Sequence, residues 1–449
     1  MTDPLRMDAW DLCDAMRRGA LDPVETAEFF CERVETYDRR IHAFLWFDRE
    51  DVLRRARLLR EKVSGGGTPG PLFGLPVAVK DNICVAGTPT TAGSRILEGW
   101  RAPYDATVVK RLRDAGAVPF GKTNLDEFGM GSSCEYSAFG PTRNPYDAER
   151  VPGGSGGGSA AAVAARLTPA ALGSDTGGSV RQPAAFCGVT GHRPTYGVVS
   201  RRGLIAFASS LDQIGPVAPS ARDCALLLDA VAGADDGDAT TSDRWSGATA
   251  ALRRRLKDGR LEGFRIGLIR GALEASDEGV QAAVEEALRV LEKAGAEVDD
   301  VEAPILLDAV PVYQVLAAAE AGSNLARYRG VHFGPRGGAA NTAEEAIRAT
   351  RALFGAEVRR RVLLGAFVLS SGHYDAYYAN AMRCRAAVRD ALLSALDGRD
   401  ALVLPTSPTA AFRFGERTTD PLSMYEADVM TAGASLAGLP AVSVPMLQS

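Results

Sequence analysis

The sequence has no long apolar run and no N-terminal targeting segment. It contains no stretch of about 18 apolar residues, the length that a membrane-spanning helix needs. Residues 1–19 include acidic side chains and lack an apolar core of about 7 to 15 residues, so they do not resemble a signal peptide. We therefore expect a cytoplasmic protein that does not bind a membrane.

Cysteine and histidine are sparse, and their placement excludes several kinds of site. The seven cysteines are scattered and form no CxxC pair, so we expect neither a disulfide framework nor a metal site. The four histidines lie at positions 42, 192, 332 and 373. None falls in a glycine-rich turn or beside an acidic residue at a suggestive spacing, so a Ser-His-Asp triad has weak support.

Positive charge is not in excess either. The formal net charge is −5 at pH 7, which gives no indication of a nucleic-acid-binding surface. If a nucleic acid is a substrate, we expect a partner to hold it. Hydrophobic residues make up 46% and charged residues 24% of the chain, which is ordinary for a globular protein and excludes the disordered class.

Glycine is abundant, and one glycine-rich stretch, residues 152–188, contains two serines of interest. Ser155 lies in GGSGGGS and Ser179 lies in SDTGGSV. Consecutive glycines allow positive φ angles and let neighbouring N–H groups point at one spot. The stretch therefore predicts a polar binding or catalytic site.

Lys80 ends a short apolar strand predicted at Leu75–Val79. A buried lysine has a lowered pKa and can act as a base near neutral pH. Since no histidine is suitably placed, a serine-lysine pair is the available form of nucleophilic chemistry. The residues alone do not decide which of the two serines is the nucleophile.

A phosphate-binding loop is an alternative interpretation of another segment. Gly116–Thr123 matches the pattern GxxxxGK[ST]. That motif requires a strand before the loop and a helix after it, whereas we expect a helix at Thr107–Ala115 and a strand at Val118–Lys122. The order is reversed, so a nucleotide-binding protein is an unfavoured alternative.

Two further motifs overlap Ser155. Gly153–Gly157 fits the GxSxG nucleophile elbow, and Gly156–Ala161 fits the GxGxxA dinucleotide pattern. Both need a hydrophobic strand directly upstream, and residues 147–152 do not form one. We therefore favour neither motif.

The second half of the chain predicts an α/β fold. Phe264–Arg270 and Ala296–Val301 are predicted strands, and between them we expect a helix capped by Ser276 and ended by Gly295. Such a βαβ unit forms a parallel sheet. Another strand is predicted at Asp400–Pro405.

Together these segments resemble the amidase signature family over essentially the whole chain. The resemblance is carried by GLPVAVKDN around Lys80, GGSGGGSAAAVAA around Ser155 and GSDTGGSVRQPA around Ser179. Longer segments, including FGKTNLDEFGMGSS and RPTYGVVSRRGLIAFASSLDQIGP, resemble one branch of the family, the A subunits of heterotrimeric tRNA-dependent amidotransferases.

The resemblance implies a single α/β domain over residues 1–449, with a large mixed β-sheet sandwiched between helical layers. Helices are implied at about residues 5–60 and the catalytic core at about 70–449. The family continues past the segment Pro445–Ser449 through another strand and a terminal helix. We therefore expect a truncated C-terminal end that leaves a sheet edge exposed.

The implied activity is that of a glutaminase. Ser179 is implied as the nucleophile that attacks the side-chain amide of glutamine, and Ser155 passes the proton between Ser179 and the neutral amine of Lys80. The implied oxyanion hole consists of the N–H groups of Thr176, Gly177 and Gly178 together with that of Ser179.

The resemblance also implies a substrate site and partners. Arg361 is implied to bind the α-carboxylate of glutamine and Asp428 its α-amine, with Tyr313 alongside. The implied B subunit receives the ammonia and uses ATP and Mg²⁺ to amidate a charged tRNA, a small C subunit clasps the pair, and the chain itself has no cofactor. The alternative within the family is a stand-alone amidase that acts on other amides.

Overall fold

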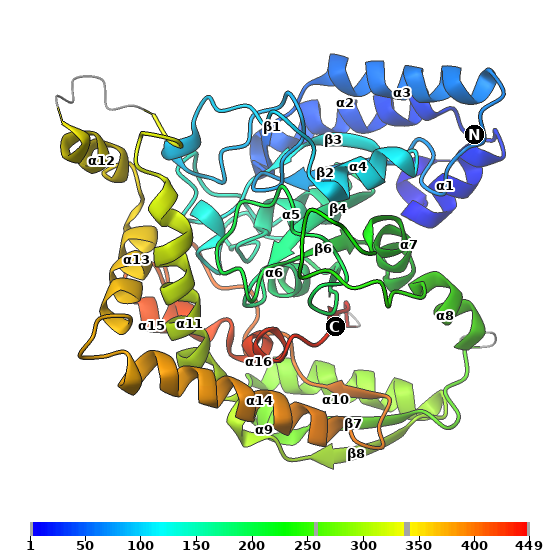
Figure 1. Ribbon diagram of the computed structural model, residues 1–449. Coiled ribbons are helices and arrows are strands. Elements are labelled where there is room, and N and C mark those ends of the chain that lie inside the picture. The colour runs from blue at the N-terminus through cyan, green and yellow to red at the C-terminus, as the bar shows by residue number, and fades with distance from the viewer. Residues whose placement is uncertain (1–2, 256–258, 336–341, 447–449) are drawn as a thin grey trace.

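The computed structural model describes residues 3–255, 259–335 and 342–446, and its centre is a seven-stranded mixed sheet (Figure 1). The strand order is β1-β3-β2-β4-β6-β5-β10. The strands are β1 (Phe44–Trp46), β2 (Pro76–Lys80), β3 (Val118–Thr123), β4 (Ala170–Asp175), β5 (Thr190–Arg193), β6 (Gln213–Ala218) and β10 (Ala441–Ser443). Only β2, β3 and β4 run parallel to one another, and the other pairs are antiparallel.

Two crossover helices explain the parallel centre of this sheet. Helix α4 (Thr107–Asp114) connects β2 to β3, and α5 (Gly157–Ala164) lies between β3 and β4. The two crossovers run in opposite directions along the sheet, so a common right-handed sense places α4 and α5 on opposite faces. Strands β2 and β4 are buried along their whole length and consist mainly of apolar residues, as a sheet covered on both faces requires.

The N-terminal helices pack at one side of the sheet, as the blue ribbons of Figure 1 show. They are α1 (Ala9–Arg17), α2 (Pro23–Ile41) and α3 (Arg49–Ser64). The sequence predicts a helix over residues 22–35 with Asp22 as its N-cap. Helix α2 does begin there, because the Asp22 carboxylate accepts hydrogen bonds from the N–H groups of Val24 and Glu25 at 2.7 and 3.2 Å. It continues past the predicted end near residue 35 to Ile41.

The order of elements around Gly116 confirms the reason for rejecting a phosphate-binding loop. Helix α4 precedes Gly116, which has a φ of +87° and ends the helix in the conformation that glycine favours. Strand β3 then contains Lys122. The segment is therefore a helix-turn-strand connection and not a strand-loop-helix connection.

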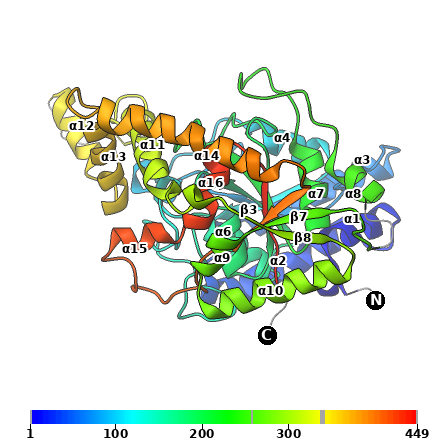
Figure 2. The ribbon, with the colours of Figure 1, turned by 90° about the horizontal axis from the view of Figure 1, so that it is seen from below.

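A second, separate sheet forms in the later part of the chain. Its order is β8-β7-β9, all parallel, and its strands are β7 (Arg265–Ile269), β8 (Glu297–Val301) and β9 (Ala401–Val403). Figure 2 shows this sheet between α10 (Glu278–Lys293) on one side and α14 (Asn380–Leu396) on the other. The predicted βαβ unit is thus present.

The predicted helix cap at Ser276 is wrong. A short helix, α9 (Arg270–Glu274), directly follows β7, and the Ser276 hydroxyl donates back to the carbonyl of Ala272 at 3.0 Å. Helix α10 begins at Glu278, with Asp277 at its N-cap position. Ser276 therefore ends one helix instead of starting the next.

The remaining helices complete the layers. Helix α6 (Arg181–Phe186) follows β4, and α7 (Ala221–Val231) packs on β5 and β6. A group that includes α11, α13, α14 and α16 packs together beside the sheet. The further helices are α8 (Ala248–Arg255), α11 (Ala309–Asn324), α12 (Ala343–Arg351), α13 (Ala356–Val368), α15 (Pro421–Glu426) and α16 (Val429–Ala437). This architecture confirms the predicted fold class, a large mixed sheet between helical layers.

Candidate active site

Lys80 and Ser155 form a buried pair at the end of strand β2. Lys80 is the last residue of the strand, and its Nζ donates to Ser155 Oγ at 2.8 Å and to the Ser174 carbonyl at 3.1 Å. Ser155 lies in the loop before α5 and follows a cis Gly154–Ser155 peptide bond. The exposed fractions of Lys80 and Ser155 are 0% and 1%. The structure therefore places the predicted lysine in contact with one of the two predicted serines.

The environment of Lys80 favours its neutral form. Burial lowers the pKa of Lys80 from 10.5 to about 8, and this effect outweighs the opposing influence of nearby Asp126 and Asp175. A lysine with such a pKa is neutral in about half of the molecules at a pH of about 8 and in a minority of them just above neutral pH. Its amine can then accept a proton through the hydrogen bond with Ser155.

Ser179 lies in the neighbouring loop, between β4 and α6. Its carbonyl accepts a hydrogen bond from the N–H of Gly156 at 3.1 Å, so the loops that carry the two serines lie side by side. Within the part of the chain that the structure describes, no side-chain hydrogen bond joins Ser155 to Ser179. The two serines are thus brought together by their backbones, and Ser155 is the one that contacts Lys80.

The glycines beside Ser179 are required by close packing. A Cβ atom on Gly177 would lie 2.6 Å from Cζ of Tyr313, and one on Gly178 would lie 2.2 Å from Oγ1 of Thr431. Thr176 is held by a hydrogen bond of 2.7 Å from its hydroxyl to Asp212. The loop is therefore fixed from two sides, which presets the directions of its N–H groups.

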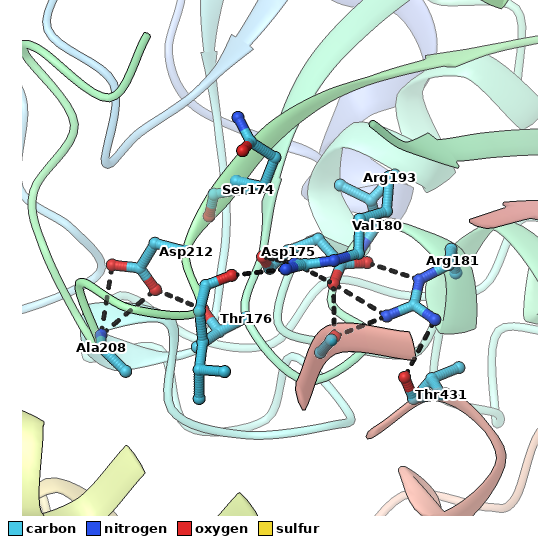
Figure 3. Close-up of polar contacts among 12 residues, drawn as sticks. Ser174, Asp175, Thr176, Val180, Arg181, Arg193, Ala208, Asp212 and Thr431 are labelled. Atoms are coloured by element: carbon cyan, nitrogen blue, oxygen red, sulfur yellow. Dashed lines mark hydrogen bonds and ion pairs between the residues drawn. The ribbon is translucent and has the colours of Figure 1, made fainter. Parts of the chain in front are cut away.

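A buried ionic network supports this loop (Figure 3). Arg181 donates two hydrogen bonds of 3.0 Å to Asp175, one to each carboxylate oxygen, and Arg193 donates to the same carboxylate at 3.0 Å. Arg181 also binds the Thr431 carbonyl at 3.0 Å. Burial by itself raises the pKa of Asp175, but Arg181 and Arg193 together hold it well below its usual range. Asp175 therefore carries a charge that anchors the base of the loop that contains Ser179.

Arg361 points inward from α13. Its Nε donates to Glu357 at 2.7 Å, and its guanidinium lies over the rings of Tyr425 and Phe207 at 5.1 and 5.5 Å. Tyr425 also donates from its hydroxyl to Glu357 at 2.9 Å. The side chain of the neighbouring Arg360 is 42% exposed, and its guanidinium also pairs with Glu357, through the other carboxylate oxygen. Arg361, whose side chain is 2% exposed, therefore differs from Arg360 in burial, although both contact Glu357.

Asp428 and Tyr313 complete the charged end of the site. Asp428 accepts a hydrogen bond from the Ser132 hydroxyl at 2.8 Å. Burial raises its pKa to about 6, while the nearby charge of Arg361 opposes this rise. Tyr313, on α11, is buried; its ring packs against Gly177, and its hydroxyl lies near the guanidinium of Arg361. A cation and a carboxylate therefore lie close to the loop of Ser179.

Two residues at the site were missed in the sequence. Glu357 orients Arg361, and its position four residues earlier on the same helix was a detectable signal. Asp126 lies in the polar loop after β3, where its carboxylate accepts the N–H groups of Cys134 and Tyr136 at 2.9 and 3.0 Å. Burial raises the pKa of Asp126 to about 7. No local pattern marked Asp126 as distinct from the other polar residues of its loop.

Other kinds of site find no support in the described ranges 3–255, 259–335 and 342–446. They contain no group of three or more histidine, cysteine, aspartate or glutamate side chains placed to hold a metal ion. No helix within the same ranges has the length and apolar character that crossing a membrane requires.

Comparison with known proteins identifies the family to which the chain belongs. The amidase family model matches residues 25–449, and the chain belongs to this family. It is 53% identical over 440 residues to a Thermus thermophilus protein named as the A subunit of glutamyl-tRNA(Gln) amidotransferase, covering 98% of this chain and 90% of the relative. A Carboxydothermus hydrogenoformans protein of the same name is 50% identical over 442 residues, covering 98% and 90%.

Solved structures agree with this assignment. The crystal structure of the glutamyl-tRNA(Gln) amidotransferase A subunit from Thermotoga maritima superposes with a TM-score of 0.81 at 41% identity, covering 100% of this chain and 89% of that chain. The peptide amidase from Stenotrophomonas maltophilia also superposes with a TM-score of 0.81, at 35% identity, covering 99% and 91%.

Proposed function

We propose that this chain is the glutaminase subunit of a tRNA-dependent amidotransferase. The observation that carries the proposal is the position of the buried Lys80–Ser155 pair beside the loop of Ser179, with Arg361 and Asp428 near the same loop. Free glutamine has a carboxylate and an ammonium group. A cation and a carboxylate at one end of the site suit such a zwitterion. The names of the relatives support the same function.

In the proposed reaction, Ser179 Oγ attacks the side-chain carbonyl carbon of glutamine. Its proton passes to Ser155, whose own proton passes to the neutral amine of Lys80. The negative charge that develops on the carbonyl oxygen is stabilised by N–H groups of residues 176–179. The C–N bond then breaks as Ser155 returns a proton to the leaving ammonia, and water hydrolyses the acyl-enzyme to glutamate.

Three side chains orient the substrate in this proposal. The guanidinium of Arg361 binds the α-carboxylate, because its nitrogens present a planar fork that matches a carboxylate. Asp428 binds the α-ammonium. Tyr313 lies alongside, against Gly177. Glu357 keeps Arg361 in place by accepting from its Nε.

The ammonia is consumed elsewhere in the proposed assembly. The partner B subunit uses ATP and Mg²⁺ to activate the carboxylate of glutamyl-tRNA(Gln), or of aspartyl-tRNA(Asn), and receives the ammonia. The small C subunit holds the two larger chains together. The chain itself then needs no cofactor. Co-purification with the B and C subunits, followed by an assay of glutamine-dependent tRNA amidation, tests this part of the proposal.

A direct test is hydrolysis of glutamine by the purified chain, both by itself and with its partner subunits. We expect release of glutamate, and loss of this release in Ser179→Ala. The second candidate is a stand-alone amidase, which the similarity to the peptide amidase of Stenotrophomonas maltophilia favours. Hydrolysis of simple amides without any hydrolysis of glutamine, in either state of assembly, would replace the first proposal with the second.

A further inference from the structure

Gln182 connects three loops of the candidate active site. Its side chain is completely buried, at 0% exposure. The side-chain Oε1 accepts the N–H of Gly154 at 2.9 Å, and Nε2 donates to the Ser132 carbonyl at 3.0 Å. The backbone N–H of Gln182 donates to the Gly178 carbonyl at 2.8 Å. The side chain therefore joins two loops that are distant in the sequence to the segment of Gly178 and Ser179, from which Gln182 itself continues.

Each of these loops carries a functional group of the proposed reaction. The first loop carries Ser155, which accepts the hydrogen bond from Lys80 at 2.8 Å. The second carries Ser132, whose hydroxyl donates to Asp428 at 2.8 Å. The third carries Ser179. Gln182 thus lies between three groups of the proposed site. They are the Lys80–Ser155 pair, Asp428, which is proposed to bind the substrate ammonium, and Ser179, the proposed nucleophile.

The orientation of the carboxamide is set by its two partners. Gly154 offers only an N–H at this point and Ser132 only a carbonyl oxygen, so a flipped amide would place like groups against each other. The carboxamide of Gln182 also packs tightly against Gly153, since a Cβ atom on Gly153 would lie 2.4 Å from Oε1 of Gln182. A displacement of the carboxamide therefore displaces the loop that carries Ser155.

We propose that Gln182 is a positioning residue that couples the ammonium-binding end of the site to the Lys80–Ser155 pair. The coupling rests on the proposed function, in which Asp428 binds the substrate ammonium. A bound ammonium fixes Asp428 and, through its hydrogen bond, the loop of Ser132. Gln182 transmits this restraint to Gly154 and thereby to Ser155. A substrate without an α-amine then loses turnover rate as well as affinity.

Gln182→Met tests the coupling, because methionine has a similar volume and forms neither hydrogen bond. We expect kcat for glutamine to fall by about 100-fold, the loss that a displacement of about 1 Å in a catalytic group produces. Glutaramate, which is glutamine without the α-amine, gives the more specific readout. The ratio of kcat for glutamine to kcat for glutaramate should be large in the unaltered chain and approach one in Gln182→Met.

Gln213 provides a matched control. It is also buried at 0% exposure, accepts a glycine N–H from Gly197 at 2.9 Å and donates to the Val199 carbonyl at 2.8 Å, but it bridges a different loop. Gln213→Met should lower the thermal stability without changing the ratio of the two kcat values. An equal loss of kcat in the two variants, or an unchanged ratio in Gln182→Met, overturns the coupling.

Gln182→Glu gives an independent test, because glutamate has nearly the same size and shape as glutamine. The protonated carboxyl can donate to the Ser132 carbonyl and accept from Gly154, whereas the ionised carboxylate cannot donate. The activity of this variant relative to the unaltered chain should therefore fall as the pH rises. A pH-independent ratio contradicts the proposed bridge.

Labelling with a serine-directed sulfonyl fluoride separates this inference from the proposed function. If the chain does not hydrolyse glutamine, the proposed function fails, but the labelling rate of Ser179 still reports how well the pair of Lys80 and Ser155 is positioned. Slower labelling of Gln182→Met than of Gln213→Met supports the positioning role. Equal labelling rates in the two variants overturn it.

Discussion

The Nζ of Lys80 lies 2.8 Å from the Oγ of Ser155, in a part of the fold where neither side chain reaches solvent. This contact joins the end of a central strand to a glycine-rich loop 75 residues later. A charged ammonium is costly in such a place, because burial removes its hydration. The pair is therefore suited to exchange a proton, which is the role that the proposed mechanism assigns to it.

Lys80→Arg should abolish glutamine hydrolysis. Arginine stays protonated at every accessible pH and cannot accept a proton from Ser155. General-base catalysis contributes about 10² to 10⁴-fold, and we expect a loss of this size in kcat. Lys110→Arg, on the exposed face of α4, is the control and should leave the rate unchanged. A Lys80→Arg variant that keeps most of the rate would contradict the role of Lys80 as a base.

The pH dependence of kcat/KM should show the neutral form of Lys80. Burial lowers the pKa of Lys80 to about 8, and only the neutral amine is a base, so the rate should rise as the pH increases through about 8. Burial raises the pKa of Asp428 to about 6, and only its ionised form attracts the substrate ammonium. A second rise through about 6 should therefore appear with glutamine and be absent with glutaramate. A profile that falls between pH 6 and 8 is the opposite of this expectation.

Three of the four serines of the glycine-rich stretch, Ser155, Ser159 and Ser179, should respond differently to replacement by alanine. Ser179→Ala should lose both hydrolysis and covalent labelling by a sulfonyl fluoride, because the proposed nucleophile is absent. Ser155→Ala should keep Ser179 but label much more slowly. Ser159 is the control, since its hydroxyl pairs with Thr123 at 2.7 Å and lies outside the catalytic pair. Ser159→Ala should lower the stability by about 1 kcal/mol and leave the activity unchanged. Mass spectrometry of the labelled site and thermal melts measure these outcomes.

Asp175→Asn should strongly destabilise the fold. It leaves the buried guanidinium groups of Arg181 and Arg193 without their counter-ion, a change that costs about 3 to 5 kcal/mol. Glu149→Gln breaks a pair with Arg413 in which the side chains are 72% and 60% exposed, and should cost less than about 1 kcal/mol. Guanidinium unfolding of both variants measures the difference.

The Asp175 contribution should also depend on pH in a defined direction. Its pKa in the folded chain is well below the value of about 3.9 in an unfolded chain. The stabilisation is therefore complete only above about pH 5 and is lost progressively as the pH falls through the unfolded pKa towards the folded one. The stability difference between the unaltered chain and Asp175→Asn should shrink in acid. A difference that grows on acidification would show that Asp175 is not ionised in the folded chain.

The chain alone should not bind Mg-ATP through Gly116–Thr123. Lys122 is paired with Asp81 at 2.9 Å, and both side chains are 1% exposed. Its Nζ also donates to the Thr90 hydroxyl at 2.8 Å, so its donors are engaged within the fold. Lys122→Met should lower stability by about 3 to 5 kcal/mol. Saturable binding of Mg-ATP in a calorimeter, lost in a folded Lys122→Met variant, would restore the nucleotide interpretation.

Features that depend on neighbouring residues could be predicted from the sequence. The Asp22 cap predicted the start of α2, and the order of elements around Gly116 excluded the phosphate-binding loop. The same reasoning failed at Ser276, since a serine there suits the end of α9 as well as the start of α10. The sequence around Ser276 cannot distinguish a helix end from a helix start when a short helix, here α9, directly precedes the longer one.

The sequence by itself determined the chemistry available to this protein: a lysine at the end of a buried strand, two serines among glycines, and no suitably placed histidine. Only the tertiary structure decided that Lys80 contacts Ser155, that Arg361 packs against the rings of Phe207 and Tyr425, and that Gln182 joins the loops of Ser132 and Ser155 to its own segment. These relationships join residues from distant segments. Their geometry follows from how the sheet and helices pack, and no periodicity along the chain encodes it.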